Sequence, residues 1–297
     1  MRAAAPPDCS ARFGAYRVGR AARLAASTHS RCSEEAPMNT TFEPSAAAAR
    51  THDETPAFAS REAALAQRID ALAWQSIEQD LDRDGRAIVR GLLARRTCEA
   101  LAALYARDDL FRSRVTMARH GFGRGEYKYF GYPLPRVIHA LRTALYPHLA
   151  PIANRWNTLM RIDARFPVEH ARFIERCHAA GQLRPTPLLL RYREGDYNCL
   201  HQDLYGEHVF PLQAAILLSE PDVDFAGGEF VITEQRPRMQ SRVDVVPLAQ
   251  GDAVIFAVHH RPVQGARGAY RVNLRHGVSR LHAGQRHTLG IIFHDAL

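Results

Sequence analysis

The second half of the chain is a succession of short apolar runs separated by turn residues, and this pattern restricts its fold more than any other feature. Beyond Pro187 the runs are LLLRYRE, LQAAILLSE, GGEFVITE, GDAVIFAV, YRVNLRHGVSRL and HTLGIIFHD, with Gly, Pro or Asp between them. Runs of this length with such boundaries are typical of β-strands. A series of these strands predicts a sandwich or a barrel.

The first half is predicted to be rich in helices. From Ser60 to the turn at Asp84-Gly85, apolar residues recur at steps of three and four, which gives one apolar helical face. RAIVRGLL then indicates a strand, and Thr97 can cap a helix that runs through Arg107. Two further helices are expected over residues 134–160 and 167–180. We therefore expect a helical support region over residues 58–184 and a β-rich core over residues 185–297.

Residues 1–57 differ from the rest of the chain in composition. They are rich in Ala, Arg, Ser and Pro and show no sustained periodicity, so we expect a disordered extension. An Arg-rich, acid-poor start is also compatible with a transit peptide. A third hypothesis is that translation begins at Met38, where the composition changes.

Composition is compatible with a globular protein of the cytoplasm. The 297 residues are 46% hydrophobic, which suffices for a full core. No stretch approaches the ~20 uninterrupted apolar residues of a membrane span. The five cysteines include no CxxC pair, which argues against both a disulfide framework and a zinc ribbon. The net charge of +8 is compatible with an anionic partner without requiring nucleic acid.

The segment YREGDYNCLHQDLYGEH, residues 192–208, places His201 and Asp203 two positions apart at the end of a predicted strand. Residues at i and i+2 of a strand point to the same face, so both side chains would reach one cavity and could hold one ion. The alternative is a hydrogen-bonded pair in a polar rim. The pair gains significance only with a further ligand downstream.

Several residues around this pair together resemble a known family. Tyr192 and Gly195 lead into HxD, Gly227-Gly228 and Gly251-Asp252 each precede a strand, and His276, Gly284 and Arg286 follow. Over roughly residues 185–296 the chain resembles the iron(II)/2-oxoglutarate dioxygenases of the prolyl-4-hydroxylase-like group. The resemblance implies a double-stranded β-helix, the jelly roll shared with cupins.

The resemblance also implies a set of site residues. His201, Asp203 and His276 would hold Fe(II) as a facial triad, which leaves open positions for 2-oxoglutarate and O2. Arg286 would anchor the far carboxylate of 2-oxoglutarate, with Tyr192 and Thr288 beside it, because a guanidinium binds a carboxylate bidentately. Catalysis would couple decarboxylation of 2-oxoglutarate to hydroxylation of a C–H bond. His259 and His260 are alternatives for the third ligand.

The closing segment LRHGVSRLHAGQRHTLGIIFHDA resembles a bacterial family labelled as oxygenases of damaged, methylated DNA, which suggests oxidative demethylation and a part in DNA repair. A loop over residues 119–135 is predicted to contact the substrate, with bases stacked on aromatic rings; its candidates are Arg124, Tyr127, Tyr129 and Tyr132. The same loop could cover a small substrate or be an ordered turn. The alternative functions are a prolyl, amino-acid or protein hydroxylase and a non-catalytic, cupin-like binding module.

Overall fold

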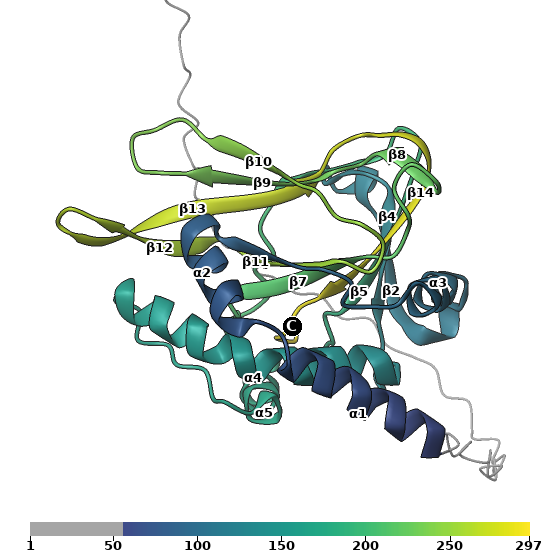
Figure 1. Cartoon of the computed structure of the whole chain (residues 1–297), viewed down its shortest axis with the longest axis horizontal. Coiled ribbons are helices and arrows are strands. Elements are labelled where there is room, and N and C mark those ends of the chain that lie inside the picture. The colour runs from purple at the N-terminus through teal and green to yellow at the C-terminus, as the bar shows by residue number, and fades with distance from the viewer. Residues whose placement is uncertain (1–55) are drawn as a thin grey trace, which may run out of the picture. The chain divides into compact units, whose positions relative to one another are not determined.

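The computed structural model describes residues 56–297, with side chains from residue 62 onward (Figure 1). Its helices are α1 (Pro56–Asp70), α2 (Trp74–Asp84), α3 (Arg95–Ala103), α4 (Arg136–Leu159) and α5 (His170–Ala179). The first strands are β1 (Arg86–Val89), β2 (Phe111–Thr116), β3 (Gly123–Arg124), β4 (Glu126–Phe130), β5 (Leu188–Arg193), β6 (Tyr197–His201) and β7 (Leu212–Leu217). The others are β8 (Phe225–Gly227), β9 (Phe230–Gln235), β10 (Arg242–Val246), β11 (Ala253–Ala257), β12 (His260–Gly265), β13 (Gly268–Val278) and β14 (Leu281–Ile291).

The strands form two antiparallel sheets that lie over one another (Figure 1). The larger sheet has the order β1-β11-β7-β14-β5-β4-β2, with β8 paired to β14. The smaller sheet has the order β10-β9-β13-β6-β3, with β12 paired to β13. Consecutive strands along the chain often lie in different sheets, as in a jelly roll. The predicted fold class, a double-stranded β-helix with flanking helices, is confirmed.

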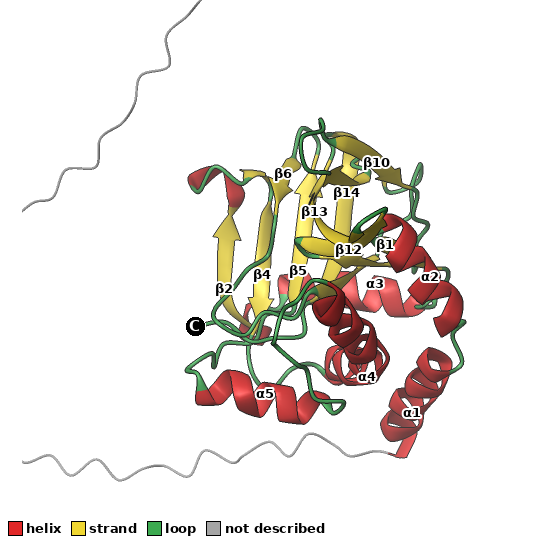
Figure 2. Ribbon diagram, turned by 90° about the vertical axis from the view of Figure 1, so that its left-hand side faces the viewer, coloured by secondary structure: helices red, strands yellow, loops and turns green. Residues whose placement is uncertain are grey.

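The helices cover one side of the larger sheet, as Figure 2 shows for α1, α4 and α5. Tyr146 of α4 is fully buried, and its ring centre lies 4.9 Å from that of Phe210 and 5.6 Å from that of Phe173 on α5. Strand β7 lies between β11 and β14 and is buried at every position. A strand covered on both faces reads as a continuous apolar run, which explains the sequence LQAAIL.

Three boundaries in the first half differ from the prediction. The helix expected from Ser60 to Asp84 is two helices, and the Trp74 indole Nε1 donates to the Ile69 carbonyl (2.8 Å) where they meet. The helix expected to start after Thr97 begins at Arg95. The loop expected over residues 119–135 contains β3 and β4, because its aromatic residues pair into the sheets.

The sheets also cross the boundary that was expected at residue 185. Strands β1, β2 and β4 precede this residue and extend the larger sheet, with β1 paired to β11 and β4 paired to β5. The support region is therefore not only helical, since its strands complete the same sheets as the core. The expected extension at residues 1–57 lies outside the described residues up to residue 55, and residues 56 and 57 belong to α1.

Among the described residues, no helix is both long enough and apolar enough to cross a membrane.

Candidate active site

Three candidate metal ligands meet between the sheets. His201 on β6 and His276 on β13 are paired in the strand register, and their ring centres lie 4.2 Å apart. Asp203 follows two residues after β6 ends, with Oδ1 3.5 Å from His201 Nε2 and Oδ2 3.4 Å from His276 Nε2. One ligand atom from each residue lies within 4.8 Å of the other two. Asp203 thus reaches the cavity from the segment after the strand, and not from the strand as predicted.

Neighbouring groups hold these side chains in place. The Nδ1 atom of His201 lies 2.8 Å from the Cys199 carbonyl, which accepts a hydrogen bond from it and leaves Nε2 to face the other two ligands. Tyr205 donates to Asp203 Oδ1 and Gln213 Nε2 donates to Asp203 Oδ2, each at 2.8 Å. A Cβ on Gly277 would lie 2.7 Å from the Asn198 carbonyl oxygen, so this glycine lets β6 approach β13 beside His276.

Sequence reasoning missed Tyr205 and Gln213. The available signal was that Gln213 is the one polar residue of LQAAIL, a strand that is otherwise apolar and buried. A buried amide is costly unless it is hydrogen-bonded, so a lone glutamine in such a strand indicates a polar partner. No comparable pattern singled out Tyr205.

The electrostatics of the cluster favour a cation. Burial opposes ionisation of Asp203, but its hydrogen bonds with His201 and His276 outweigh that effect and hold the pKa of the carboxyl well below its usual range. Burial also opposes protonation of His201, yet the Asp203 carboxylate raises the pKa of this imidazole. Burial, and then the charge of His201, lower the pKa of His276. The cluster therefore contains a carboxylate that stays ionised beside two imidazoles.

Arg286 on β14 is the charged residue of the same cavity. Its side chain is only 2% exposed, and Nη1 donates to Thr288 Oγ1 at 2.5 Å. Among the described residues, neither Arg286 Nε nor the buried Tyr192 hydroxyl has a hydrogen-bond partner. Burial lowers the pKa of Arg286 to about 10, so it stays charged at neutral pH. A buried, incompletely paired guanidinium is unfavourable, and a carboxylate ligand would stabilise it.

A single cavity of about 220 Å³ joins these groups. The three candidate ligands, Arg286, Tyr192 and Thr288 all line it. The structure thus brings together every residue that was predicted for the metal and for 2-oxoglutarate.

Of the four predicted substrate residues, two lie at the cavity and two lie away from it. Tyr127 lines the cavity, and Tyr129 lies against it with ring centres 5.3 Å apart. Arg124 lies on the surface, 3.8 Å from Asp196. Tyr132 is outside the cavity lining, because its hydroxyl donates to Asp295 (2.8 Å) in a buried ion-pair network. That Tyr132 contacts substrate therefore stays a prediction.

The alternative third ligands are not at this site. His259 and His260 lie at the start of β12, with their ring centres 4.2 Å apart, and neither lines the cavity. Within residues 56–297, the one cluster of His, Cys, Asp or Glu that could hold an ion is His201, Asp203 and His276. The structure favours His276 over both alternatives.

A jelly roll with two imidazoles and one carboxylate in its cavity defines the class of non-haem iron(II) oxygenases. Comparison with known sequences agrees, since a family model described as "Oxygenase, catalysing oxidative methylation of damaged DNA" matches residues 125–296. The chain belongs to this family. The family match and the triad confirm the predicted resemblance and the predicted enzyme, an oxygenase that uses Fe(II), 2-oxoglutarate and O2.

Similar proteins include two uncharacterised proteins from Mycobacterium tuberculosis strains CDC 1551 and H37Rv. Each is 49% identical over 167 residues, which cover 56% of this chain and 72% of the relative. A solved prolyl hydroxylase from Trichoplax adhaerens, in complex with a hypoxia inducible factor peptide fragment, is 14% identical with a TM-score of 0.48 and covers 80% of this chain and 92% of its own. A 2OG-Fe(II) oxygenase family oxidoreductase from Burkholderia pseudomallei is 15% identical with a TM-score of 0.47, and the coverage is 76% and 94%.

Proposed function

We propose that His201, Asp203 and His276 hold the Fe(II) of this oxygenase, that Arg286 binds the far carboxylate of 2-oxoglutarate, and that the substrate is an alkylated base of nucleic acid. The observation that carries the proposal is that the three ligands and an incompletely paired, buried arginine line one cavity. The dianion 2-oxoglutarate offers a carboxylate to the arginine.

The donor set fits the metal. Two imidazoles and one carboxylate occupy one face of an octahedral ion and leave three positions open. When bound, Fe(II) activates O2 with electrons from the decarboxylation of 2-oxoglutarate to succinate, and the substrate C–H bond is hydroxylated.

The protein's own residues position and shield this chemistry. Tyr205 and Gln213 fix the Asp203 carboxylate, and burial followed by the Asp203 charge raises the pKa of Tyr205, so its hydroxyl keeps the proton that it donates. The rings of Phe230 and Phe256 lie 5.9 Å and 4.6 Å from that of His276 and exclude water from one side. Arg286 and Tyr192 orient the co-substrate, and Tyr127 lies where a planar base could stack.

The family description supports a damaged nucleic acid as substrate. One O2 and one 2-oxoglutarate would convert an N-methyl group to N-hydroxymethyl, with succinate and CO2 as the other products. The hydroxymethyl group then leaves as formaldehyde and the nitrogen regains its proton. Membership of an oxygenase family leaves the cupin-like binding module without support.

Product release tests the proposal. Purified protein would be supplied with Fe(II), 2-oxoglutarate and O2 together with N-methylated oligonucleotides, unmodified oligonucleotides, proline-containing peptides or free amino acids. We expect succinate and formaldehyde in equal amounts with methylated oligonucleotides alone. Succinate release that rises only with peptides or amino acids would instead establish a hydroxylase of those substrates.

A further inference from the structure

A cationic groove lies outside the cavity, between two hairpins of the smaller sheet. Its lining contains Arg236, Arg238, His260 and Arg271, the other members are Gln235, Pro237, Val272 and Asn273, and no carboxylate lines it. Figure 1 shows the β9–β10 hairpin and the β12–β13 hairpin ending on the same side of the two sheets. The groove therefore concentrates positive charge on one part of the surface.

Strand register explains why these residues meet. Asn273 of β13 pairs with Gln235 of β9 on one side and with His260 of β12 on the other. Arg236 follows the end of β9 in the turn toward β10, and Arg271 lies two residues before Asn273. The turn after β9 thus contributes Arg236 and Arg238 to the groove, and β13 contributes Arg271.

The positive charge of the groove is only partly neutralised. Arg236 pairs with Glu234 at 3.0 Å, but this buried carboxylate also accepts hydrogen bonds from the buried Arg261. Arg271 donates to the neutral carbonyl of Met160 (2.7 Å), which leaves its charge uncompensated by that contact. Arg238 is exposed. Guanidinium groups in such positions can each pair with a phosphate in a bidentate manner.

The groove adjoins the catalytic cavity through one side chain. Gln202 lines the cavity, and its Nε2 atom donates to Asn273 Oδ1 and to the Leu274 carbonyl, each at 2.6 Å. Asn273 in turn lines the groove. The groove and the cavity are thus separated by the hydrogen-bonded pair Gln202 and Asn273.

We propose that this groove binds the phosphates of the nucleic-acid strand whose alkylated base enters the cavity. The inference rests on the proposed function, because it assumes the same substrate. Phosphate contacts position a strand without reading its sequence, which suits an enzyme that must find a lesion in any context. An acidic peptide is the competing partner.

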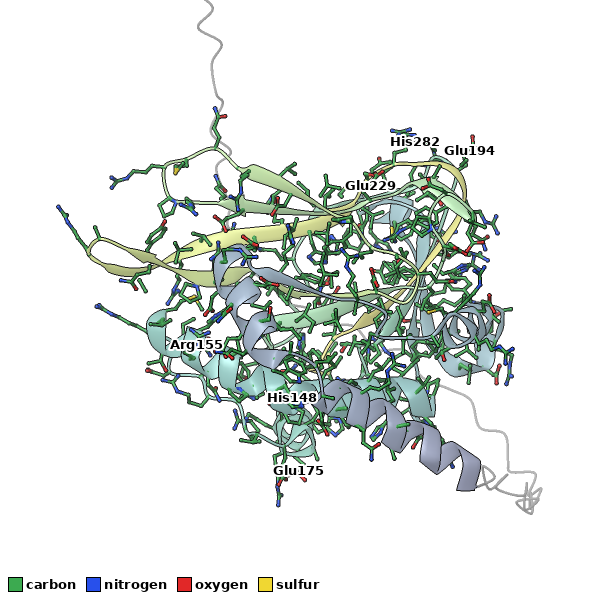
Figure 3. All side chains as sticks on the ribbon, viewed as in Figure 1. His148, Arg155, Glu175, Glu194, Glu229 and His282 are labelled. Atoms are coloured by element: carbon green, nitrogen blue, oxygen red, sulfur yellow. The ribbon has the colours of Figure 1, made fainter. Side chains whose placement is uncertain are left out.

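The test uses the double variant Arg236→Gln/Arg238→Gln, in which Glu234 keeps Arg261. The matched control is Arg172→Gln on α5, which also removes exposed positive charge. Figure 3 shows Glu175 of the same helix on the opposite side of the molecule from the β9–β10 hairpin. Thermal unfolding midpoints would verify that each variant is folded.

Binding of a labelled single-stranded oligonucleotide would be measured by fluorescence anisotropy over a range of salt concentrations. We expect the Kd of the double variant to rise at least about tenfold at low salt, and the slope of log Kd against log salt to fall by about 1.4, or about 0.7 for each lost phosphate contact. In the succinate assay, KM for the methylated oligonucleotide should rise while kcat and the KM for 2-oxoglutarate stay unchanged. The control should match the wild type throughout.

Three outcomes would overturn the proposal, and each identifies a different cause of failure. If the wild type oxidises methylated oligonucleotides and the double variant binds them equally well, the groove is not used although the proposed function stands. If the wild type neither binds nor oxidises oligonucleotides, the groove and the proposed substrate fail together. The third outcome is that polyglutamate peptides displace the oligonucleotide from the wild type, and that their Kd depends on salt as steeply as that of the oligonucleotide. The groove would then be a peptide site.

Discussion

Two histidines on neighbouring strands decide where the metal ion can be held. His201 and His276 are opposite one another in the register of β6 and β13, so their rings meet without any special loop. Asp203 completes the set from the chain after β6. Each of the three supplies one donor atom, and no fourth candidate lies in the same cluster within the described residues.

Replacing His276 with alanine should abolish metal binding, because only two donors would remain. We expect turnover to fall by more than about a hundredfold, since losing a group that merely orients a ligand already costs about ten- to a hundredfold. Mn(II) binding, followed by electron paramagnetic resonance, would measure the effect without relying on activity. His259→Ala is the matched control, because His259 lines neither the cavity nor the groove. It should keep both binding and turnover, and the reverse result would move the third ligand to His259.

Arg286→Ala should weaken the binding of 2-oxoglutarate and leave metal binding intact. Charged hydrogen bonds contribute about 1.5 to 3 kcal/mol, so KM for 2-oxoglutarate should rise about ten- to a hundredfold. Arg286→Lys should recover only part of the loss, because one ammonium does not reproduce the bidentate fork. Steady-state kinetics with each substrate varied in turn would check this, and Mn(II) binding should be unaffected. An unchanged KM for 2-oxoglutarate would place the anchor elsewhere.

At the level of elements, a hydrogen bond and an ion pair join helix α2 to helix α4. The Asp82 carboxylate of α2 accepts a hydrogen bond from the Trp156 indole (2.7 Å) and pairs with Arg155 of α4 (2.7 Å). Figure 3 labels Arg155 on α4. The Trp156 side chain is fully buried, so its N–H depends on Asp82.

Asp82→Ala should therefore destabilise the fold by about 1 to 3 kcal/mol, the cost of leaving a buried donor unpaired. The change would be measured as the free energy of unfolding in urea. Asp80→Ala on the same helix is the control, because Asp80 pairs with the exposed Arg83 and such surface pairs contribute about 0 to 1 kcal/mol. Equal losses in the two variants would show that the Trp156 contact contributes nothing beyond a surface ion pair.

At the level of the whole molecule, several buried histidines link stability to pH. His170, His287 and His294 are all buried. The Nε2 atom of His170 lies 2.8 Å from the carbonyl of Phe293, the residue before His294. Burial lowers the pKa of His170 to about 3 and that of His287 and His294 to about 4. In the unfolded chain each would titrate near its ordinary value of about 6.5.

Because these folded-state pKa values are depressed, protons bind the unfolded chain preferentially below about pH 6.5. The contribution of these three histidines to the free energy of unfolding should thus be constant above this pH and fall below it, by up to about 1.4 kcal/mol per pH unit for each histidine. Urea unfolding at pH 8, 6.5 and 5.5 would measure the slope. His170→Gln should reduce the slope, whereas His120→Gln, at an exposed position, should not. A stability that stays flat down to pH 5 would contradict the prediction.

The β-rich class and the residues of the site can be predicted from the sequence alone. Alternation along a strand and spacing along the chain are local properties, so the apolar runs beyond Pro187, the HxD pair and the step from His276 to Arg286 could be read before any fold was known. The family resemblance then connected these residues, and the structure places all of them around one cavity.

The other segments of the sheets and of the site are known only once the chain is folded. Strand β1 pairs with β11 and β4 pairs with β5, partners that are far away in sequence, and β2 joins the sheet through β4. The hydrogen bond from the Tyr132 hydroxyl to Asp295 joins residues that are 163 positions apart in the chain. Tyr205 and Gln213 acquire a role only because folding brings Asp203 within hydrogen-bond distance. Such contacts depend on long-range packing, which no local pattern encodes.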